Sequence, residues 1–131
     1  MTCKILVVDD QPDQQEIVRL LLNPMGFEVN CAKDAENAWE IAHEISPDIF
    51  LIDLKLPGRD GLSLCADLRE EPGLSHIPRI IVSGVDKQDL RLENLSEYAD
   101  DYITKPFDIQ KLAESVQVLI NKKDASSEIQ K

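Results

Sequence analysis

Polar residues that could do chemistry stand directly after short apolar runs in this sequence. The clearest run is Ile49-Phe50-Leu51-Ile52, which is bounded by Pro47 on one side and ends at a carboxylate on the other. An apolar run of this length between turn signals is typical of a strand buried on both faces, as in parallel sheets. The residues that occupy such strand-end positions are Asp9, Asp10, Asp53, Ser83 and Lys105.

In a parallel sheet these ends share one edge, where ligands of open α/β sheets bind. At about 4 Å and an effective dielectric constant of about 20, each carboxylate pair repels by about 4 kcal/mol, which favours a bound divalent cation. Mg²⁺ prefers oxygen ligands and keeps several waters. The Lys105 ammonium could hold an anion, and the Ser83 hydroxyl could donate to a phosphoryl oxygen. These groups predict a site for a small tetrahedral anion beside Mg²⁺, with a carboxylate as nucleophile for phosphoryl transfer.

The elements that must position these residues alternate along the chain. Pro12 suits the first turn of a helix, Asp34 and Asp108 suit helix caps, and Pro24, Gly26 and Pro47 suit helix ends. An alternating chain of this kind predicts an α/β domain with right-handed crossovers, in which helices cover both faces of a parallel sheet. The expected strands span residues 4–8, 27–32, 49–52, 79–82 and 101–104, and the expected helices 12–23, 35–46, 62–70, 87–97 and 109–120.

Apolar spacing supports these helices unequally. The last helix has the clearest period, from Ile109 to Ile120, and the first shows Ile17, Leu20 and Leu21 at helical spacing. In the fourth helix, the expected inward stripe is Leu92, Leu95 and Ala99, with Leu90 exposed. We expect one domain over residues 1–121, followed by a polar, flexible tail or linker over residues 122–131.

Composition limits the classes of function. The chain has 131 residues, 43% of them hydrophobic and 30% charged, which fits one globular domain. The formal net charge of −11 argues against non-specific binding to nucleic acid or to an anionic membrane. No apolar run is long enough to cross a membrane, and the N-terminus lacks signal-peptide anatomy. The 3 cysteines form no C-x-x-C pair, so we expect a reducing, cytoplasmic environment.

Four motifs together resemble one known family. They are Val7-Val8-Asp9-Asp10-Gln11-Pro12, Ile52-Asp53-Leu54-Lys55-Leu56-Pro57-Gly58-Arg59-Asp60-Gly61, Ile81-Val82-Ser83-Gly84 and Ala99-Asp100-Asp101-Tyr102-Ile103-Thr104-Lys105-Pro106-Phe107. In this order and at strand ends, they are similar to the receiver domains of two-component response regulators over about residues 4–121. The resemblance implies a flavodoxin-like (βα)5 fold, doubly wound, with strand order 2-1-3-4-5.

The resemblance also implies the roles of the site residues. Asp53 is the expected phospho-acceptor, modified to 4-aspartylphosphate. Asp10, Asp53 and the backbone carbonyl of Lys55 are the expected Mg²⁺ ligands, and Asp9 helps to position the metal. Lys105 pairs with the phosphoryl group, Ser83 hydrogen-bonds to it, and Tyr102 changes rotamer in response. The Lys105–Pro106 peptide bond is commonly cis in this family.

The implied function is a phosphorylation-controlled switch rather than an enzyme acting on a separate substrate. Its expected phosphodonor is a sensor histidine kinase or a histidine phosphotransfer protein. The face formed by the fourth helix, fifth strand and fifth helix is expected to bind an output partner or a second copy. Val85 offers no polar group to an attacking water, so we expect slow self-dephosphorylation.

Other classes of function fit less well. A Mg²⁺-dependent aspartyl-phosphate phosphatase of the haloacid-dehalogenase type needs a second Asp where this chain has Lys55. A flavodoxin needs a Ser/Thr-rich phosphate loop after the first strand, which is absent. A receiver-like binding module that is never phosphorylated remains the alternative, although neither the acceptor Asp53 nor Lys105 is missing.

Overall fold

A single parallel sheet organises the chain. The computed structural model describes residues 3–85 and 95–129, and side chains of the last helix through residue 122. The strand order is β2-β1-β3-β4-β5, which confirms the expected flavodoxin-like α/β fold. The strands are β1 (Cys3–Val8), β2 (Phe27–Ala32), β3 (Ile49–Ile52), β4 (Arg79–Ser83) and β5 (Asp101–Thr104).

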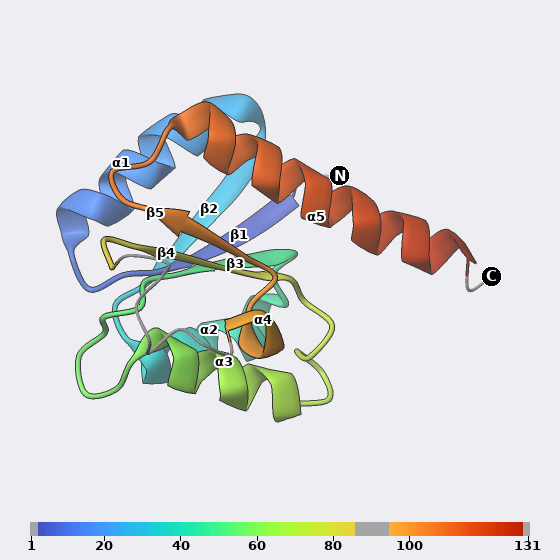
Figure 1. Cartoon of the computed structure of the whole chain (residues 1–131), viewed down its shortest axis with the longest axis horizontal. Coiled ribbons are helices and arrows are strands. Elements are labelled where there is room, and N and C mark those ends of the chain that lie inside the picture. The colour runs from blue at the N-terminus through green and yellow to red at the C-terminus, as the bar shows by residue number, and fades with distance from the viewer. Residues whose placement is uncertain (1–2, 86–94, 130–131) are drawn as a thin grey trace.

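Helices cover both faces of this sheet. In Figure 1, α1 and α5 lie on one face, while α2, α3 and α4 lie on the other. The doubly wound arrangement follows from right-handed crossovers that place successive helices on opposite sides of a reversing strand order. The helices are α1 (Pro12–Leu22), the short 3-10 helix η1 (Asn23–Met25), α2 (Ala35–Ile45), α3 (Gly61–Glu70), α4 (Leu95–Tyr98) and α5 (Ile109–Ile129).

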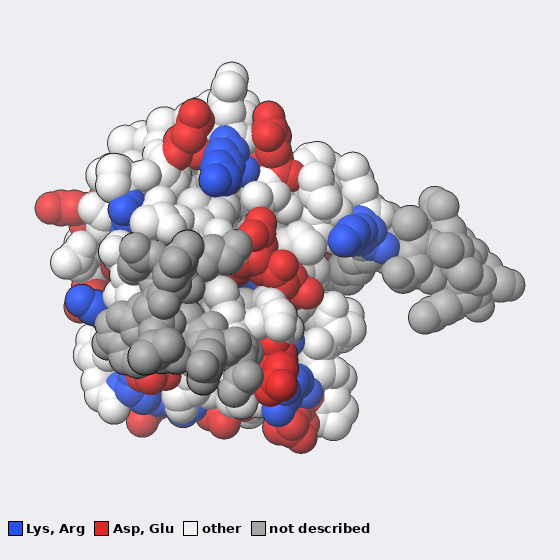
Figure 2. All heavy atoms as spheres, viewed as in Figure 1, with Lys and Arg blue, Asp and Glu red and all other residues white. Residues whose placement is uncertain are grey.

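Charged side chains of both signs lie interspersed over the face shown in Figure 2. Among the described residues, no helix combines the length and the apolar character that a membrane span needs. Of the charged residues that the structure describes, Asp9 and Arg79 are the ones that are buried.

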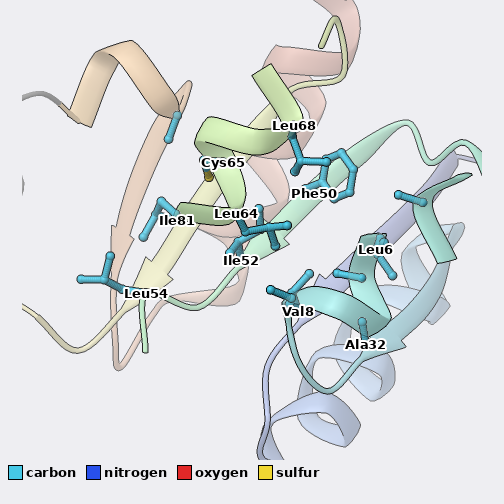
Figure 3. Close-up of a cluster of buried hydrophobic side chains, with 14 of the residues drawn as sticks. Leu6, Val8, Ala32, Phe50, Ile52, Leu54, Leu64, Cys65, Leu68 and Ile81 are labelled. Carbon is cyan, nitrogen blue, oxygen red and sulfur yellow. The ribbon is translucent and has the colours of Figure 1, made fainter. Parts of the chain in front are cut away.

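The interior consists of two apolar clusters, one on each side of the sheet. On the side of α3, Phe50 and Ile52 of β3 meet Leu64 and Leu68, as Figure 3 shows. All four residues of β3 are buried. Burying a large aliphatic side chain contributes about 1.5–3 kcal/mol, so β3 is a rigid base for the residue that follows it, Asp53.

The first helix is confirmed, but its buried side differs from the apolar positions that predicted it. Ile17, Leu20 and Leu21 are 44%, 64% and 39% exposed, whereas Val18 and Leu22 are buried. Val18 and Leu22 are one helical turn apart and pack into the cluster on the α1 side. The sequence could not show which of two overlapping apolar stripes faces the sheet.

The last two helices differ in length from their predictions. Residues 87–94 of the expected fourth helix, including Leu90 and Leu92, lie outside the described residues. The described α4 is short, with Leu95 partly buried and Ala99 buried just beyond its end. The helix α5 does not end near residue 121 but continues to Ile129, projecting beyond the sheet in Figure 1. The division into a domain and a flexible tail stays a prediction.

Candidate functional site

Backbone hydrogen bonds beyond the strand ends place the site residues. The Asp53 amide donates to the carbonyl of Val8 at 2.9 Å, which continues the β1–β3 pairing by one residue. The Lys105 amide donates to the carbonyl of Ser83 at 2.8 Å and does the same for β4 and β5. Side chains from four different strands are thereby held at one edge of the sheet.

Three carboxylates meet at this edge. One carboxylate oxygen from each of Asp9, Asp10 and Asp53 lies within 4.8 Å of the others. Asp9 is buried, Asp53 is partly buried and Asp10 is exposed, so the cluster opens toward solvent on the Asp10 side. This oxygen-only donor set suits a hard cation that retains water, which is the coordination Mg²⁺ prefers. The acidic cluster could therefore hold a metal ion.

Lys105 brings the positive charge expected at this site. Its Nζ donates to Asp9 Oδ2 at 3.1 Å and to Asp53 Oδ2 at 3.2 Å. Burial disfavours the charged ammonium, but the negative charges of Asp53 and Asp9 outweigh that effect, so the pKa of Lys105 is raised. The ammonium stays protonated at neutral pH and is available to an anion bound next to Asp53.

Ser83, Val85 and Tyr102 form the β4–β5 side of the site. Ser83 is 1% exposed, and its Oγ accepts a hydrogen bond from the Val85 amide at 3.1 Å. The Tyr102 hydroxyl donates to the Val85 carbonyl, and the residue is 6% exposed. Tyr102 thus contacts the loop beyond Ser83 and already occupies an inward position in this structure. The change of the Tyr102 rotamer that the resemblance implies stays a prediction.

The loop after β3 wraps around Asp53. The Lys55 amide donates to Asp53 Oδ1 at 3.1 Å, while the Lys55 residue as a whole is exposed. Together with Asp10, Gln11 and Ser83, these residues line an open pocket of about 460 Å³. A pocket of this size leaves room for a phosphoryl group with hydrated metal. The Lys105–Pro106 peptide bond that follows β5 is cis, as expected.

Gly61 is needed for close packing rather than for a left-handed backbone conformation. Its φ is not among the positive ones. A Cβ at Gly61 would instead overlap the carbonyl oxygen of Asp53 and lie 3.0 Å from Ile52 Cγ2. The start of α3 therefore packs directly against the backbone of Asp53, and only glycine permits that approach.

Sequence reasoning missed two glutamines near Asp9. The Gln11 amide donates to Asp9 Oδ1 at 3.0 Å, and Gln15 Nε2 donates to the Asp9 carbonyl at 2.7 Å. Helical periodicity places Gln15 on α1 but cannot show that its side chain reaches back to a strand end. The Gln11 contact is a local Asx turn between residues two positions apart, whereas no spacing rule connects Gln15 with Asp9, so only the fold reveals that contact.

Comparison with known proteins gives a consistent result. Residues 5–117 match the family model of the response regulator receiver domain. A receiver domain of a signal transduction histidine kinase from Syntrophus aciditrophicus is 30% identical, with a TM-score of 0.84 and 92% of each chain covered. A receiver domain of a Francisella response regulator is 30% identical, with a TM-score of 0.83 over 92% of this chain and 98% of that one. A receiver domain protein from Clostridium thermocellum is 28% identical, with a TM-score of 0.85 over 94% and 98% of the two chains.

Proposed function

The chain belongs to the response regulator receiver domain family, whose members are signalling modules rather than classical enzymes, and on that premise we propose that Asp53 is its phospho-acceptor. One observation carries the assignment. Lys105 bridges Asp9 and Asp53, and of these two carboxylates it is Asp53 that follows the central strand and lines the open pocket beside Ser83. The acceptor carboxylate thus contacts its counter-charge and shares a pocket with a hydroxyl group.

The proposed reaction moves a phosphoryl group from a phosphohistidine to Asp53. A carboxylate oxygen of Asp53 forms the new P–O bond, and the P–N bond to the donor imidazole breaks. The electron pair of the broken bond stays on the imidazole nitrogen, which takes up a proton. Charge neutralisation and positioning supply most of the catalysis in such transfers. Lys105 and Ser83 are the groups placed to neutralise and hydrogen-bond the transferred oxygens.

We propose Mg²⁺ as the metal of the acidic cluster. Asp10, Asp53 and the Lys55 carbonyl would hold it, and Asp9 would orient it. The oxygen-only donor set and the opening beside Asp10 support this choice. When bound, Mg²⁺ would offset the negative charge of the transferred group. Lys105 keeps Asp9 and Asp53 within reach of a shared ion.

Membership of the receiver family indicates which class of protein supplies the phosphoryl group. A receiver domain implies a histidine kinase partner, acting directly or through a histidine phosphotransfer protein. We propose that the acyl phosphate biases Ser83 and Tyr102 between two states and alters the face built by α4, β5 and α5. An output partner or a second copy would read that face in the cytoplasm. The net charge of −11 gives no support to direct nucleic-acid binding.

Mass measurement of the intact protein tests this proposal. The protein is incubated with a small acyl-phosphate donor and Mg²⁺, in parallel with Asp53→Asn. We expect one added phosphoryl group on the wild type and none on Asp53→Asn. Absence of added mass on the wild type would support the unphosphorylated binding module instead.

The environment of Val85 supports a long-lived acyl phosphate. Val85 lines the pocket with an apolar side chain, and its two backbone polar groups bond to Ser83 and Tyr102. The side chain of Val85 has no polar group that could orient an attacking water, and both of its backbone polar groups already have a partner. A half-life of seconds for the phosphorylated protein would contradict slow hydrolysis.

A further inference from the structure

The side-chain amide of Gln15 ties two strand ends together. Gln15 lies on α1 and is partly buried. Its Nε2 donates to the Asp9 carbonyl at 2.7 Å and approaches the Ala32 carbonyl at 3.4 Å. The Asp9 amide in turn donates to the same Ala32 carbonyl at 3.0 Å. One helix side chain thus links the ends of β1 and β2.

The Asp9 carbonyl needs this donor because it lies beyond the sheet pairing. The β1–β2 register ends at Val8 and Ala32, and Asp9 is 5% exposed. Among the described residues, Gln15 is the donor found for this carbonyl. Leaving a buried backbone acceptor unpaired is destabilising, because the loss of its hydration is not offset by a hydrogen bond. Without Gln15, the strand end would have to move to reach water or another donor.

The position of the Asp9 backbone determines where its carboxylate lies in the charged cluster. Its Oδ1 accepts from the Gln11 amide at 3.0 Å, and its Oδ2 accepts from Lys105 Nζ at 3.1 Å. The same Nζ reaches Asp53 Oδ2 at 3.2 Å. A displaced Asp9 backbone therefore displaces a carboxylate of the cluster and the ammonium that serves the acceptor.

We propose that Gln15 is a positioning residue for the metal and phosphoryl site, acting through Asp9. This inference rests on the proposed function, because it takes Mg²⁺ to be the ion that the acidic cluster binds. Gln15 itself touches neither the ion nor the phosphoryl group. It sets the geometry in which the Asp9 carboxylate faces Asp10 and Asp53. Partners that orient metal ligands in this way typically contribute about 10- to 100-fold to metal affinity.

The test compares Gln15→Met, which keeps the side-chain length but loses the donor, with the wild type. Gln117→Met is the matched control, because Gln117 donates its amide to Asn121 at an exposed site on α5. Isothermal titration with Mg²⁺ alone should show about tenfold weaker binding for Gln15→Met and wild-type affinity for Gln117→Met. In Gln15→Met, the Mg²⁺ concentration for half-maximal phosphorylation should rise by a similar factor. The maximal rate of phosphorylation should change less.

A second readout does not depend on metal. Protection of the Gln11 amide from hydrogen exchange reports its bond to Asp9 Oδ1. This protection should fall in Gln15→Met. It should return in Gln15→Arg, because arginine restores a donor. Wild-type Mg²⁺ affinity in Gln15→Met overturns the proposal, and so does equal weakening in Gln117→Met. If the wild type itself binds no Mg²⁺, the metal role fails, and unchanged Gln11 protection in Gln15→Met then overturns the positioning role.

Discussion

Lys105 Nζ lies 3.2 Å from Asp53 Oδ2, although the two residues are 52 positions apart in the chain. The side chains are 22% and 15% exposed, so the contact is largely shielded from solvent. The same ammonium also contacts Asp9. A single cation therefore balances two carboxylates of the site, and its removal has consequences for both stability and phosphorylation.

Replacing Lys105 by Met is expected to slow phosphorylation and to destabilise the fold. Asp9 and Asp53 lose their shared counter-charge, at a cost of about 2 kcal/mol for hydrogen bonds to charged groups. Urea unfolding without metal measures this loss. Added Mg²⁺ should stabilise Lys105→Met more than the wild type, because the ion then supplies the missing positive charge. Equal stabilisation of both proteins would contradict this role of Lys105.

Replacing Asp10 by Asn is expected to stabilise the metal-free protein. The exposed Asp10 carboxylate adds repulsion to a cluster whose oxygens lie within 4.8 Å, and relief of that repulsion is worth about 1 kcal/mol near solvent. The stabilisation by Mg²⁺ should shrink in the same variant, because a ligand is lost. Thermal unfolding with and without Mg²⁺ measures both changes. A lower unfolding midpoint for metal-free Asp10→Asn than for the metal-free wild type would contradict the role given to carboxylate repulsion.

Replacing Gly61 by Ala is expected to destabilise the protein by about 2 kcal/mol, in the range of overpacking costs. The new methyl group would meet the carbonyl of Asp53 and Ile52 Cγ2. Phosphorylation should slow as well, because the displaced backbone carries the acceptor. Gly73→Ala is the control, since a Cβ there meets nothing within 4 Å and φ is not positive. Similar losses in both variants would point to glycine propensity instead of contact with Asp53.

Arg79 is a buried cation held by backbone carbonyls. It is 7% exposed, its Nε donates to the Tyr98 carbonyl at 2.9 Å, and its Nη1 approaches the carbonyls of Ser75 and Ile77 at 3.4 and 3.5 Å. Tyr98 ends α4, so Arg79 satisfies a carbonyl that has no partner within the helix. The start of β4 is thereby attached to the end of α4.

Arg79→Met should cost about 2 kcal/mol, because buried carbonyls lose their donor. Arg69→Met is the control. Arg69 is exposed, donates to the Glu97 carbonyl at 3.1 Å and lies 4.8 Å from the centre of the Tyr98 ring. Its loss should cost about 1 kcal/mol or less. Chemical denaturation measures both, and the reverse order of the two losses would contradict the role given to Arg79.

His43 is expected to give a pH-dependent contribution to stability. A hydrogen bond with the Trp39 carbonyl and another with the Glu71 carboxylate raise the pKa of His43 above its usual value of 6.5. The folded state therefore binds the proton more tightly than the unfolded state. The stabilisation is present below pH 6.5 and is lost as pH rises through the folded pKa. Thermal midpoints of wild type and His43→Gln should converge at high pH, and a constant difference would exclude this linkage.

Much of the architecture could be predicted because local patterns determine it. The run from Ile49 to Ile52 is apolar at every position and bounded by turn signals, which is typical of a strand covered on both faces. Asp34 caps α2 through the Asn37 amide, as its residue type suggested. Strand ends carrying Asp9, Asp53, Ser83 and Lys105 converge once the strands are parallel.

Other features depended on packing. Apolar stripes overlap on α1, and the sheet selects Val18 and Leu22 over Ile17 and Leu20. The continuation of α5 to Ile129 has no apolar pattern that could have predicted it.

The sequence by itself determined which chemical groups stand at the strand ends, because a buried strand shows in its apolar run and polar residues follow that run. Only the tertiary structure decided how those groups are held. Gly61 against the Asp53 carbonyl, Gln15 on the Asp9 carbonyl and Tyr102 on Val85 join residues whose spacing in the chain follows no period. Such contacts arise where helices and loops dock on the sheet edge, and their geometry exists only once the whole chain has folded.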